Sequence, residues 1–385
     1  MRHHKYNPNF EFVVEPKDFN KYSDKNLLQY CLGATMYMPG TKDFSQKILN
    51  NDMPGLTSMV FCFEDACPED KVEEAETNVI HVLDVLATAL EEGTLTYDNL
   101  PLIFCRVRSQ EQFIRFAEQL TKHHVKALTG INFPKFNAQN GDVYMFYLNQ
   151  LNKKFGEILY GMPIIEDPEV AFKETRMVEL IEIKKILDKY KDIVLQVRVG
   201  ATDFSSCFGV RRGVDYSIYD ILTVREILSD IINVFGRNND YVISGPVWEY
   251  FRASKQMMFE DLPSYDVEDC LLKRIPIVNT EIDGLLREVV LDKANGFVGR
   301  TVIHPTHVPY VNAMQAVTKE EYTDAVNILG SETGGVFKGE SGNKMNEVKP
   351  HTNWATKIYM RAQAYGVIEN ENSYIKLFTP QQSNV

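Results

Sequence analysis

Residues 162–199 read MPIIEDPEVAFKETRMVELIEIKKILDKYKDIVLQVRV and contain a complete strand, helix and strand in succession. The apolar runs Met162–Ile165 and Ile193–Val199 predict two buried strands. Between them, apolar side chains recur at a spacing near 3.6 residues over Glu169–Tyr190, which predicts a helix. A helix that joins two buried strands implies that these strands are parallel. This stretch therefore predicts an α/β fold built on a parallel sheet.

The same alternation of apolar runs and helical segments extends over most of the 385 residues. Six further runs predict strands: Thr35–Met38, Met59–Phe63, Leu102–Val107, Gly130–Phe133, Tyr241–Ser244 and Thr301–Ile303. Helical spacing recurs in Lys71–Glu91, Gln110–His123 and Tyr216–Phe235. Eight parallel strands joined by helices close into a barrel, and the turn MPGTKDF lacks the glycine-rich pattern of a dinucleotide-binding sheet. We therefore predict a (β/α)8 TIM barrel.

Two regions outside this pattern divide the chain into three parts. Residues 1–31 form an N-terminal extension, residues 32–329 the barrel, and residues 330–385 a C-terminal lid loop and helical tail. We assign the lid role because long connections without secondary structure in a compact protein are often functional lids. His3 and His4 at the start are interpreted as part of a frayed terminus.

Composition excludes several classes of partner. The formal net charge of −12 argues against a surface that binds nucleic acid or anionic lipid. No stretch reaches the roughly 18 uncharged apolar residues of a membrane helix, and the first residues, MRHHKYNPNFEF, lack the apolar segment of a signal peptide. The six cysteines include no C-x-x-C pair and are expected to be reduced. These features predict a cytoplasmic protein that acts on a small molecule.

Polar side chains gather where the predicted strands end, which is the catalytic face of a barrel of this kind. They include Glu64, Asp65, Arg106, Lys135, Glu166 and Asp203. Glu166 and Asp203 follow the fifth and sixth strands, which are neighbours, so their carboxylates are expected to converge. Two carboxylates completed by water suit a hard cation, whereas without a cation their repulsion raises the pKa of one of them. We predict that Glu166 and Asp203 bind Mg²⁺, with Mn²⁺ as an alternative.

Two other residues at this face leave alternatives open. Arg106 can offer a bidentate fork to a substrate carboxylate or enolate, or it can form an internal salt bridge with Glu64 or Asp65. The residue pattern does not choose between these roles. His304, in VIHPTH, is interpreted as a hydrogen-bonded turn residue rather than a base or a metal ligand.

An ordered series of motifs resembles the HpcH/HpaI aldolase and citrate lyase beta-subunit superfamily. The motifs are MYMPGTK, VFCFEDACPEDK, CRVR, INFPK, MPIIEDP, RVGATDFSSCFGVRRG and NGFVGRTVIHPTHVPYVN. The extra length outside them is similar to the divergent C–C bond lyase branch of this superfamily. The resemblance implies a TIM-barrel lyase that assembles as a trimer or hexamer and acts on a small carboxylate or an acyl-CoA.

Several family roles fall on residues of this chain. The resemblance places the metal ligands at Glu166 and Asp203 and the arginine that binds the substrate carboxylate at Arg106. It places the acidic residues of the second-strand motif at Glu64 and Asp65. Both are candidates for moving a proton to or from the substrate.

Four further residues take roles from the resemblance. Glu347 aligns with the acid of a late lid segment that exchanges a proton with the substrate. Pro39 and Gly40, in MYMPGTK, and Lys135, in INFPK, are expected to contact the substrate. Together these residues would surround one site at the carboxyl end of the barrel.

Three departures from the family pattern bear on the substrate. Gly33 stands where the family has an arginine that helps to hold coenzyme A or the substrate, Cys62 where it has an aspartate, and Thr202 where it has a glutamate. These departures weaken the expectation of a coenzyme A thioester.

The reaction that the resemblance implies is aldol or Claisen chemistry through an enolate, on a 2-oxo or 3-hydroxy acid. Two alternatives remain open. The same scaffold could hydrolyse an acyl-CoA thioester, or it could be a barrel that binds a ligand without catalysis. The appearance of free coenzyme A with an intact acyl skeleton would distinguish hydrolysis from cleavage of a carbon–carbon bond.

Overall fold

Seven parallel strands form the central sheet of this computed structural model, which describes residues 1–252, 266–331, 334–339, 342 and 344–379. They follow the order β6-β5-β4-β3-β2-β1-β7. Their bounds are β1 Ala34–Pro39, β2 Ser58–Cys62, β3 Leu102–Arg106, β4 Leu128–Phe133, β5 Tyr160–Ile165, β6 Arg198–Val199 and β7 Arg300–Val302. Each overlaps a predicted run. Most of their residues are buried, as expected of strands between a barrel interior and a layer of helices.

The eighth predicted run, Tyr241–Ser244, completes the ring between β6 and β7 without forming a regular strand. Ile243 bridges to Val197 and Gly245 bridges to Arg300, both in parallel. The N–H of Ser244 donates to the carbonyl oxygen of Val197 at 2.9 Å, and that of Gly245 to Gly299 at 3.0 Å. Because hydrogen bonds link this segment to both neighbours, the curled sheet has the predicted barrel arrangement.

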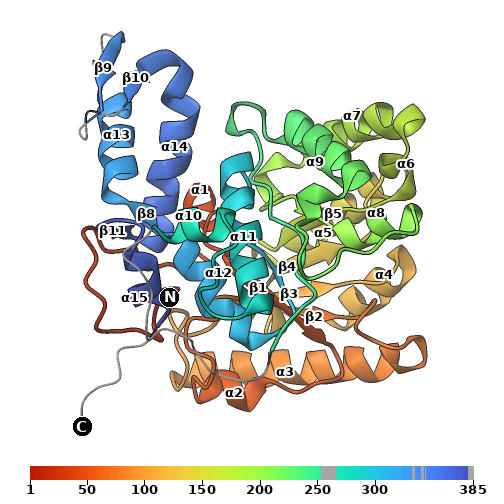
Figure 1. The fold of residues 1–385 in the computed structure, drawn as a ribbon. Coiled ribbons are helices and arrows are strands. Elements are labelled where there is room, and N and C mark those ends of the chain that lie inside the picture. The colour runs from red at the N-terminus through yellow and green to blue at the C-terminus, as the bar shows by residue number, and fades with distance from the viewer. Residues whose placement is uncertain (253–265, 332–333, 340–341, 343, 380–385) are drawn as a thin grey trace.

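Helices surround the strands and pack their apolar faces against them (Figure 1). Their bounds are α2 Ser45–Leu49, α3 Val72–Glu92, α4 Gln110–Gln119, α5 Gly141–Phe155, α6 Pro168–Ala171, α7 Lys173–Lys189, α8 Ala201–Cys207, α9 Leu222–Phe235, α10 Val267–Leu272, α11 Thr280–Asn295 and α12 Val308–Met314. The predicted helix Gln110–His123 ends early, since Leu120 is extended. The predicted helix Glu169–Tyr190 is divided into α6 and α7 at Phe172, which is also extended.

The C-terminal part adds a pair of helices beside the barrel. Its elements are β8 Val317–Thr318, α13 Lys319–Leu329, β9 Val336–Lys338, β10 Met345–Glu347, α14 Val348–Tyr365, β11 Val367–Ile368 and α15 Ser373–Phe378. The antiparallel β9–β10 hairpin lies at the end of α13 and α14 that points away from the barrel (Figure 1). Within the loop predicted as a lid, residues 332–333, 340–341 and 343 lie outside the described residues. No helix in the described part of the chain is long and apolar enough to cross a membrane.

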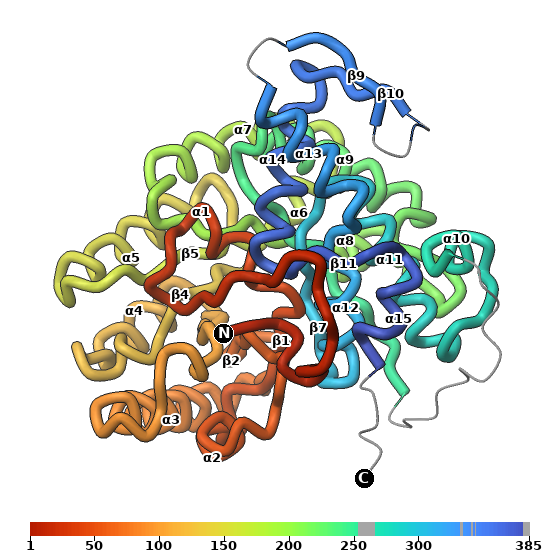
Figure 2. Tube along the Cα trace, turned by 90° about the vertical axis from the view of Figure 1, so that its left-hand side faces the viewer, coloured from red at the N-terminus to blue at the C-terminus, as the bar shows by residue number. Residues whose placement is uncertain are grey.

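The first 31 residues, which include α1 (Lys25–Leu28), lie across the amino ends of the barrel strands, beside α14 and β11 (Figure 2). The N–H of Val13 donates to the carbonyl oxygen of Val367 at 2.8 Å. The buried ammonium group of Lys21 donates to the carbonyl oxygens of Val125 and Leu128 at 2.6 and 3.0 Å, where β4 begins. The extension therefore covers the amino end of the barrel.

His3 and His4 are buried, so the prediction that they belong to a frayed terminus is wrong. The ring nitrogens of His3 lie 3.1 and 2.7 Å from the carbonyl oxygens of Ala364 and Cys31, and Nε2 of His4 lies 3.1 Å from that of Tyr365. Burial lowers the pKa of His3 to about 4 and that of His4 to about 3. Two of these three contacts are to residues more than 300 positions away, which the sequence around the histidines does not reveal.

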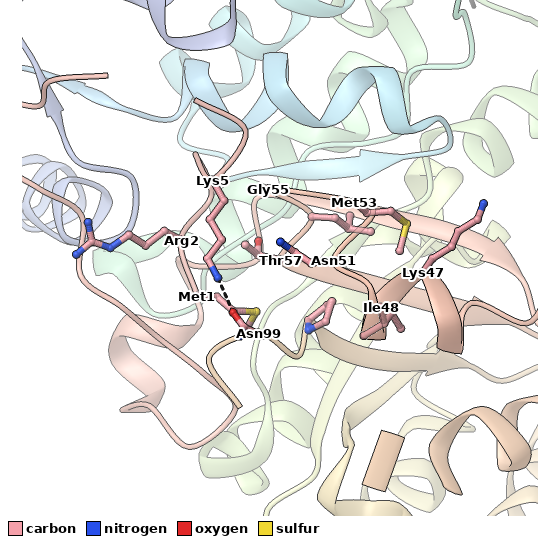
Figure 3. Close-up of a pocket in the computed structure, with 12 residues that line it drawn as sticks. Met1, Arg2, Lys5, Lys47, Ile48, Asn51, Met53, Gly55, Thr57 and Asn99 are labelled. Carbon is pink, nitrogen blue, oxygen red and sulfur yellow. Dashed lines mark hydrogen bonds between the residues drawn. The ribbon is translucent and has the colours of Figure 1, made fainter. Parts of the chain in front are cut away.

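Next to these histidines, a small cavity of about 20 Å³ lies among Met1, Arg2, Lys5 and the loop before β2 (Figure 3). The ammonium group of Lys5 donates to Oδ1 of Asn99 at 2.8 Å across its edge. A cavity of this size holds no more than a water molecule.

The buried histidines predict a loss of stability in mild acid. The unfolded chain takes up protons near pH 6.5, whereas the folded protein takes them up only near the lowered pKa values of about 4 and 3. Stability is therefore complete above pH 6.5 and falls as the pH drops toward 4, by about 1.4 kcal/mol per pH unit for each histidine. Urea unfolding at pH 7.5 and 5.5 measures this difference.

The double variant His3→Gln/His4→Gln is expected to lose less stability between these two pH values than the wild-type protein. His81→Gln, on the exposed side of α3, serves as the control and is expected to behave as wild type. A double variant with the same loss as wild type would show that these two histidines do not cause the acid sensitivity.

Candidate active site

Two carboxylates lie at the carboxyl ends of neighbouring strands. Glu166 directly follows β5, and Asp203 lies in the first turn of α8, after β6. Glu166 is buried, and its pKa rises to about 8 because burial disfavours the charged form and the Asp203 carboxylate lies nearby. Burial likewise raises the pKa of Asp203. The two groups thus share one polar edge of the barrel, and the Asp203 carboxylate makes ionisation of Glu166 harder.

Backbone features around Glu166 hold its side chain in place. A Cβ atom on Gly200 would lie 2.6 Å from Glu166 Cβ and 2.9 Å from Cδ, so only glycine leaves room for this carboxylate. The N–H of Lys135 donates to Glu166 Oε1 at 3.0 Å. Lys135 has a φ of 46°, a left-handed conformation that is unusual outside glycine. The residue with this unusual backbone conformation is thus the one whose N–H donates to the Glu166 carboxylate.

Arg106 forms the internal salt bridge that the sequence left as one of two alternatives. Its Nη1 lies 3.0 Å from Glu64 Oε2 and 3.1 Å from Asp65 Oδ2. Lys135 pairs with the other oxygen of Glu64 and lies 3.9 Å from Asp203 Oδ1. Burial would lower the pKa of Lys135, but its bond to Glu64 and the nearby carboxylates outweigh this effect and raise it. Both cations are therefore already paired with carboxylates.

Two of the departures from the family pattern have clear structural consequences. Cys62 Sγ accepts hydrogen bonds from Nε of Arg106 at 3.1 Å and from the N–H of Glu64 at 3.2 Å. The thiol therefore acts as the acceptor where the family has a carboxylate. Gly33 has a φ of 57°, and a Cβ atom there would lie 2.5 Å from Asn312 Oδ1. An arginine at this position would require the surrounding residues to move.

A cavity of about 480 Å³ opens beside the carboxylates. Its lining includes five of the residues predicted from the sequence: Pro39, Asp65, Arg106, Glu166 and Asp203. It also includes Thr202, the third departure from the family pattern. Residues from five of the barrel strands or the loops after them thus meet at one site.

Four other predicted residues are not part of the cavity lining. Glu64 and Lys135 belong to the ion-pair cluster next to it. Gly40 is buried, with its N–H bonded to the carbonyl oxygen of Cys62 at 2.9 Å, and a Cβ atom there would meet the Phe63 ring at 3.0 Å. Glu347 is exposed at the end of β10, in the hairpin that points away from the barrel (Figure 1).

The model of a protein family, described as the C–C bond lyase of the TIM-barrel fold, matches residues 26–367. This chain belongs to that family. The match confirms the resemblance and the fold predicted from the motifs, and it makes the protein a carbon–carbon bond lyase. Among curated proteins, none matches this lyase.

Solved structures with a similar fold include CitE from Mycobacterium tuberculosis in complex with magnesium, acetoacetate and coenzyme A. It is 17% identical to this lyase, covers 87% of this chain and 99% of its own, and superposes with a TM-score of 0.53. RipC from Yersinia pestis is 13% identical over 74% of this chain and 95% of its own, with a TM-score of 0.46. Malate synthase from Haloferax volcanii, as a lead(II) complex, is 12% identical over 75% and 74% of the two chains, with a TM-score of 0.49.

The cavity of the lyase also contains residues that the sequence analysis did not select, among them Tyr37, Arg198 and Thr301. Tyr37 accepts a hydrogen bond from the amide of Asn132 at 2.7 Å, and the guanidinium groups of Arg106 and Arg198 lie 5.4 and 5.7 Å from the centre of its ring. A charged residue inside the run Ile193–Val199 was the signal that could have drawn attention to Arg198.

The carboxylate pair of the lyase suits a magnesium ion. Within the described residues, no group of three or more His, Cys, Asp or Glu side chains forms a metal site. Mg²⁺ commonly takes only one or two carboxylates and fills its remaining positions with water and substrate. The pKa values of Glu166 and Asp203 are raised although Arg106 and Lys135 lie nearby, so part of their negative charge still lacks a compensating charge. A divalent cation between them would supply it.

His304 has the structural role predicted for it. Its Nδ1 lies 2.7 Å from the hydroxyl oxygen of Thr306, and the ring stacks on Phe251 with a centroid distance of 4.4 Å. It caps the short turn Pro305–His307.

Proposed function

We propose that this lyase makes or breaks a carbon–carbon bond of a small carboxylate, a 2-oxo or 3-hydroxy acid, with Mg²⁺ bound by Glu166 and Asp203. The observation that carries the proposal is the pair of carboxylates, buried Glu166 and partly exposed Asp203, whose pKa values are raised and which line a cavity of about 480 Å³. The fold supports it too, since CitE of similar fold was crystallised with magnesium and acetoacetate. When bound, Mg²⁺ would serve as Lewis acid and template for the substrate carboxylate and its neighbouring oxygen.

Arg106 is the residue of this chain best placed to stabilise an enolate. Its guanidinium group lines the cavity, and it is oriented from three sides by Cys62, Glu64 and Asp65. A preorganised cation of this kind offsets the negative charge that develops on the substrate oxygen without having to reorient during the reaction.

Asp65 is our choice among the acids proposed to move a proton. Its side chain lines the cavity and is 62% exposed. Glu64, by contrast, is buried between Arg106 and Lys135, and Glu347 lies in the distant hairpin. Because proton transfer requires direct contact or one bridging water, Asp65 is the acid with access to a ligand in the cavity.

A mass-spectrometric screen tests the function. The protein is incubated with Mg²⁺ and a panel of 2-oxo and 3-hydroxy acids, free and as coenzyme A thioesters, and products with a shortened or lengthened carbon skeleton are sought. We expect such products to disappear with a chelator and to return when Mg²⁺ is restored. Free coenzyme A with an intact acyl group would indicate hydrolysis instead. Metal binding without turnover of any panel member would contradict the proposed reaction.

A substitution at Gly200 tests the metal site without replacing any of the carboxylate residues. Gly200→Ala is expected to weaken Mg²⁺ binding about tenfold or more, because the added Cβ would displace the Glu166 side chain. Calorimetric titration with MgCl₂ measures the effect. Gly213→Ala is the matched control, since the nearest atom to its added Cβ is 3.5 Å away. Equal Mg²⁺ affinity in both variants would show that Glu166 is not a ligand.

A further inference from the structure

Arg198 extends from β6 into the centre of the barrel and is 1% exposed. Its Nη2 donates to the hydroxyl oxygen of Thr301 at 2.7 Å. Its Nη1 donates to Oε1 of Gln196 at 3.1 Å and to the hydroxyl oxygen of Thr35 at 3.4 Å. All of these acceptors are neutral. Within the described residues, the positive charge of Arg198 is therefore stabilised by neutral polar groups and by the Tyr37 ring, without a carboxylate.

No carboxylate of the described residues pairs with Arg198, and its Nε has no hydrogen-bond partner among them. Burial accordingly lowers the pKa of Arg198. Four of the other five buried arginines among the described residues pair with carboxylates: Arg106, Arg176, Arg212 and Arg300. The fifth, Arg361, donates to backbone carbonyl oxygens and lies outside the cavity lining. A buried charge without a counter-ion is costly, and proteins rarely keep one without a reason. The missing anion is thus expected to come from outside the chain.

The cavity is the place from which this anion can approach. Arg198, Thr301 and Tyr37 all belong to its lining. Arg106, the other arginine there, is already paired with two carboxylates. Arg198 is therefore the arginine of the lining that lacks a carboxylate partner among the described residues.

The neighbours of Arg198 suit a carboxylate group. The hydroxyl of Thr301 accepts from Arg198, and that of Tyr37 accepts from Asn132, so each retains its own proton to donate. A guanidinium group and two hydroxyl donors on one wall form a site for the two oxygens of a carboxylate.

We propose that Arg198 binds a second carboxylate of the substrate, so that this lyase acts on a small dicarboxylate. One carboxylate belongs at the metal site of Glu166 and Asp203, and the other at Arg198 with Thr301 and Tyr37. The proposal rests on the proposed function, because it assumes that the first carboxylate binds at the metal. It defines the substrate class as free acids with an anionic group at both ends.

Pairs of 2-oxo acids that differ only at the far end test this specificity in the wild-type protein. Calorimetry with Mg²⁺ present compares 2-oxoglutarate with 2-oxopentanoate, and oxaloacetate with 2-oxobutyrate. We expect at least one dicarboxylate to bind about tenfold or more tightly than its monocarboxylate partner, the usual gain from a charged hydrogen bond. Equal affinity within both pairs would overturn the inference.

Variants at position 198 test whether this residue causes the preference. Arg198→Gln is expected to reduce the preference to about threefold or less and to leave Mg²⁺ binding as in wild type. Arg198→Lys, which keeps the charge, should retain part of it. Arg361→Gln is the control: Arg361 is also buried, but it donates to the carbonyl oxygens of Gln315 and Ala316 and lies outside the cavity lining. If Arg198→Gln prefers dicarboxylates as strongly as the wild-type protein does, Arg198 is not the residue that binds the second carboxylate.

Failure of the inference can be told apart from failure of the proposed function. If both members of each pair bind only with Mg²⁺ and with equal affinity, the metal site stands and the role of Arg198 is wrong. If no acid binds in the presence of Mg²⁺, the proposed function is wrong and the inference with it. If Arg198→Gln does not fold, Thr301→Val removes one donor from the same wall and should reduce the preference without removing the charge.

Discussion

Replacing Glu166 by glutamine or Asp203 by asparagine is expected to weaken Mg²⁺ binding by roughly 100-fold or more, since loss of a supporting group outside the ligand shell already costs about 10- to 100-fold. Each substitution removes one of two charged oxygen ligands while keeping the size of the side chain. Turnover of any substrate found in the screen should fall in parallel, because the proposed reaction needs the cation. Calorimetric titration with MgCl₂ and rates at saturating Mg²⁺ measure the two effects.

Asp167→Asn is the matched control for this prediction. Asp167 is the next residue after Glu166, caps α6 through the N–H of Glu169, and does not line the cavity. Because asparagine caps a helix about as well as aspartate, the substitution should change stability little and leave Mg²⁺ affinity unchanged. Wild-type affinity in both Glu166→Gln and Asp203→Asn would mean that the carboxylates do not bind the metal.

Arg106→Gln is expected to lower kcat by roughly 100- to 1000-fold, the usual cost of removing one preorganised group that stabilises an oxyanion. Glu64 would still pair with Lys135, and Asp65 is exposed to water, so the substitution leaves no isolated buried carboxylate. The fold should therefore survive. Steady-state rates and circular dichroism of the purified variant check both parts.

Arg106→Lys separates charge from geometry, because lysine keeps the charge but cannot donate from a rigid fork. We expect its kcat to lie between those of Arg106→Gln and wild type. Arg115→Gln removes an exposed arginine that pairs with Glu76 on the outside of the barrel, and it should leave kcat unchanged. An Arg106→Gln enzyme with a kcat close to wild type would exclude a role for this arginine in stabilising the enolate.

Most of the barrel could be predicted from the sequence because buried strands are apolar over their whole length. The run Leu102–Val107, for example, contains β3 entirely. Prediction was less accurate where structure departs from regular hydrogen bonding. Tyr241–Ser244 occupies the position of a strand but makes only single bridges, and Phe172 interrupts a continuous helical pattern. Both features depend on the tertiary contacts of the backbone, which the periodicity of apolar residues does not reveal.

The carboxylates at the site could be predicted because the ends of parallel strands meet at one edge of a barrel. The same rule gave the salt bridge of Arg106 with Glu64 or Asp65 as one of two alternatives, and only the structure showed that it forms. The role of each residue at the site was harder to predict from the sequence. Gly40 packs against Phe63 instead of lining the cavity, although it lies in the same motif as Pro39.

By itself, the sequence determined the order of strands and helices, the barrel fold and the edge at which Glu166 and Asp203 lie. These properties follow from local periodicity and from the geometry that any closed parallel sheet imposes. Only the tertiary structure decided that residues 1–31 close the amino end and that no carboxylate of the described residues pairs with Arg198. The burial of a residue and the pairing of its charge depend on residues that are distant in sequence. They are therefore decided only when the chain has folded.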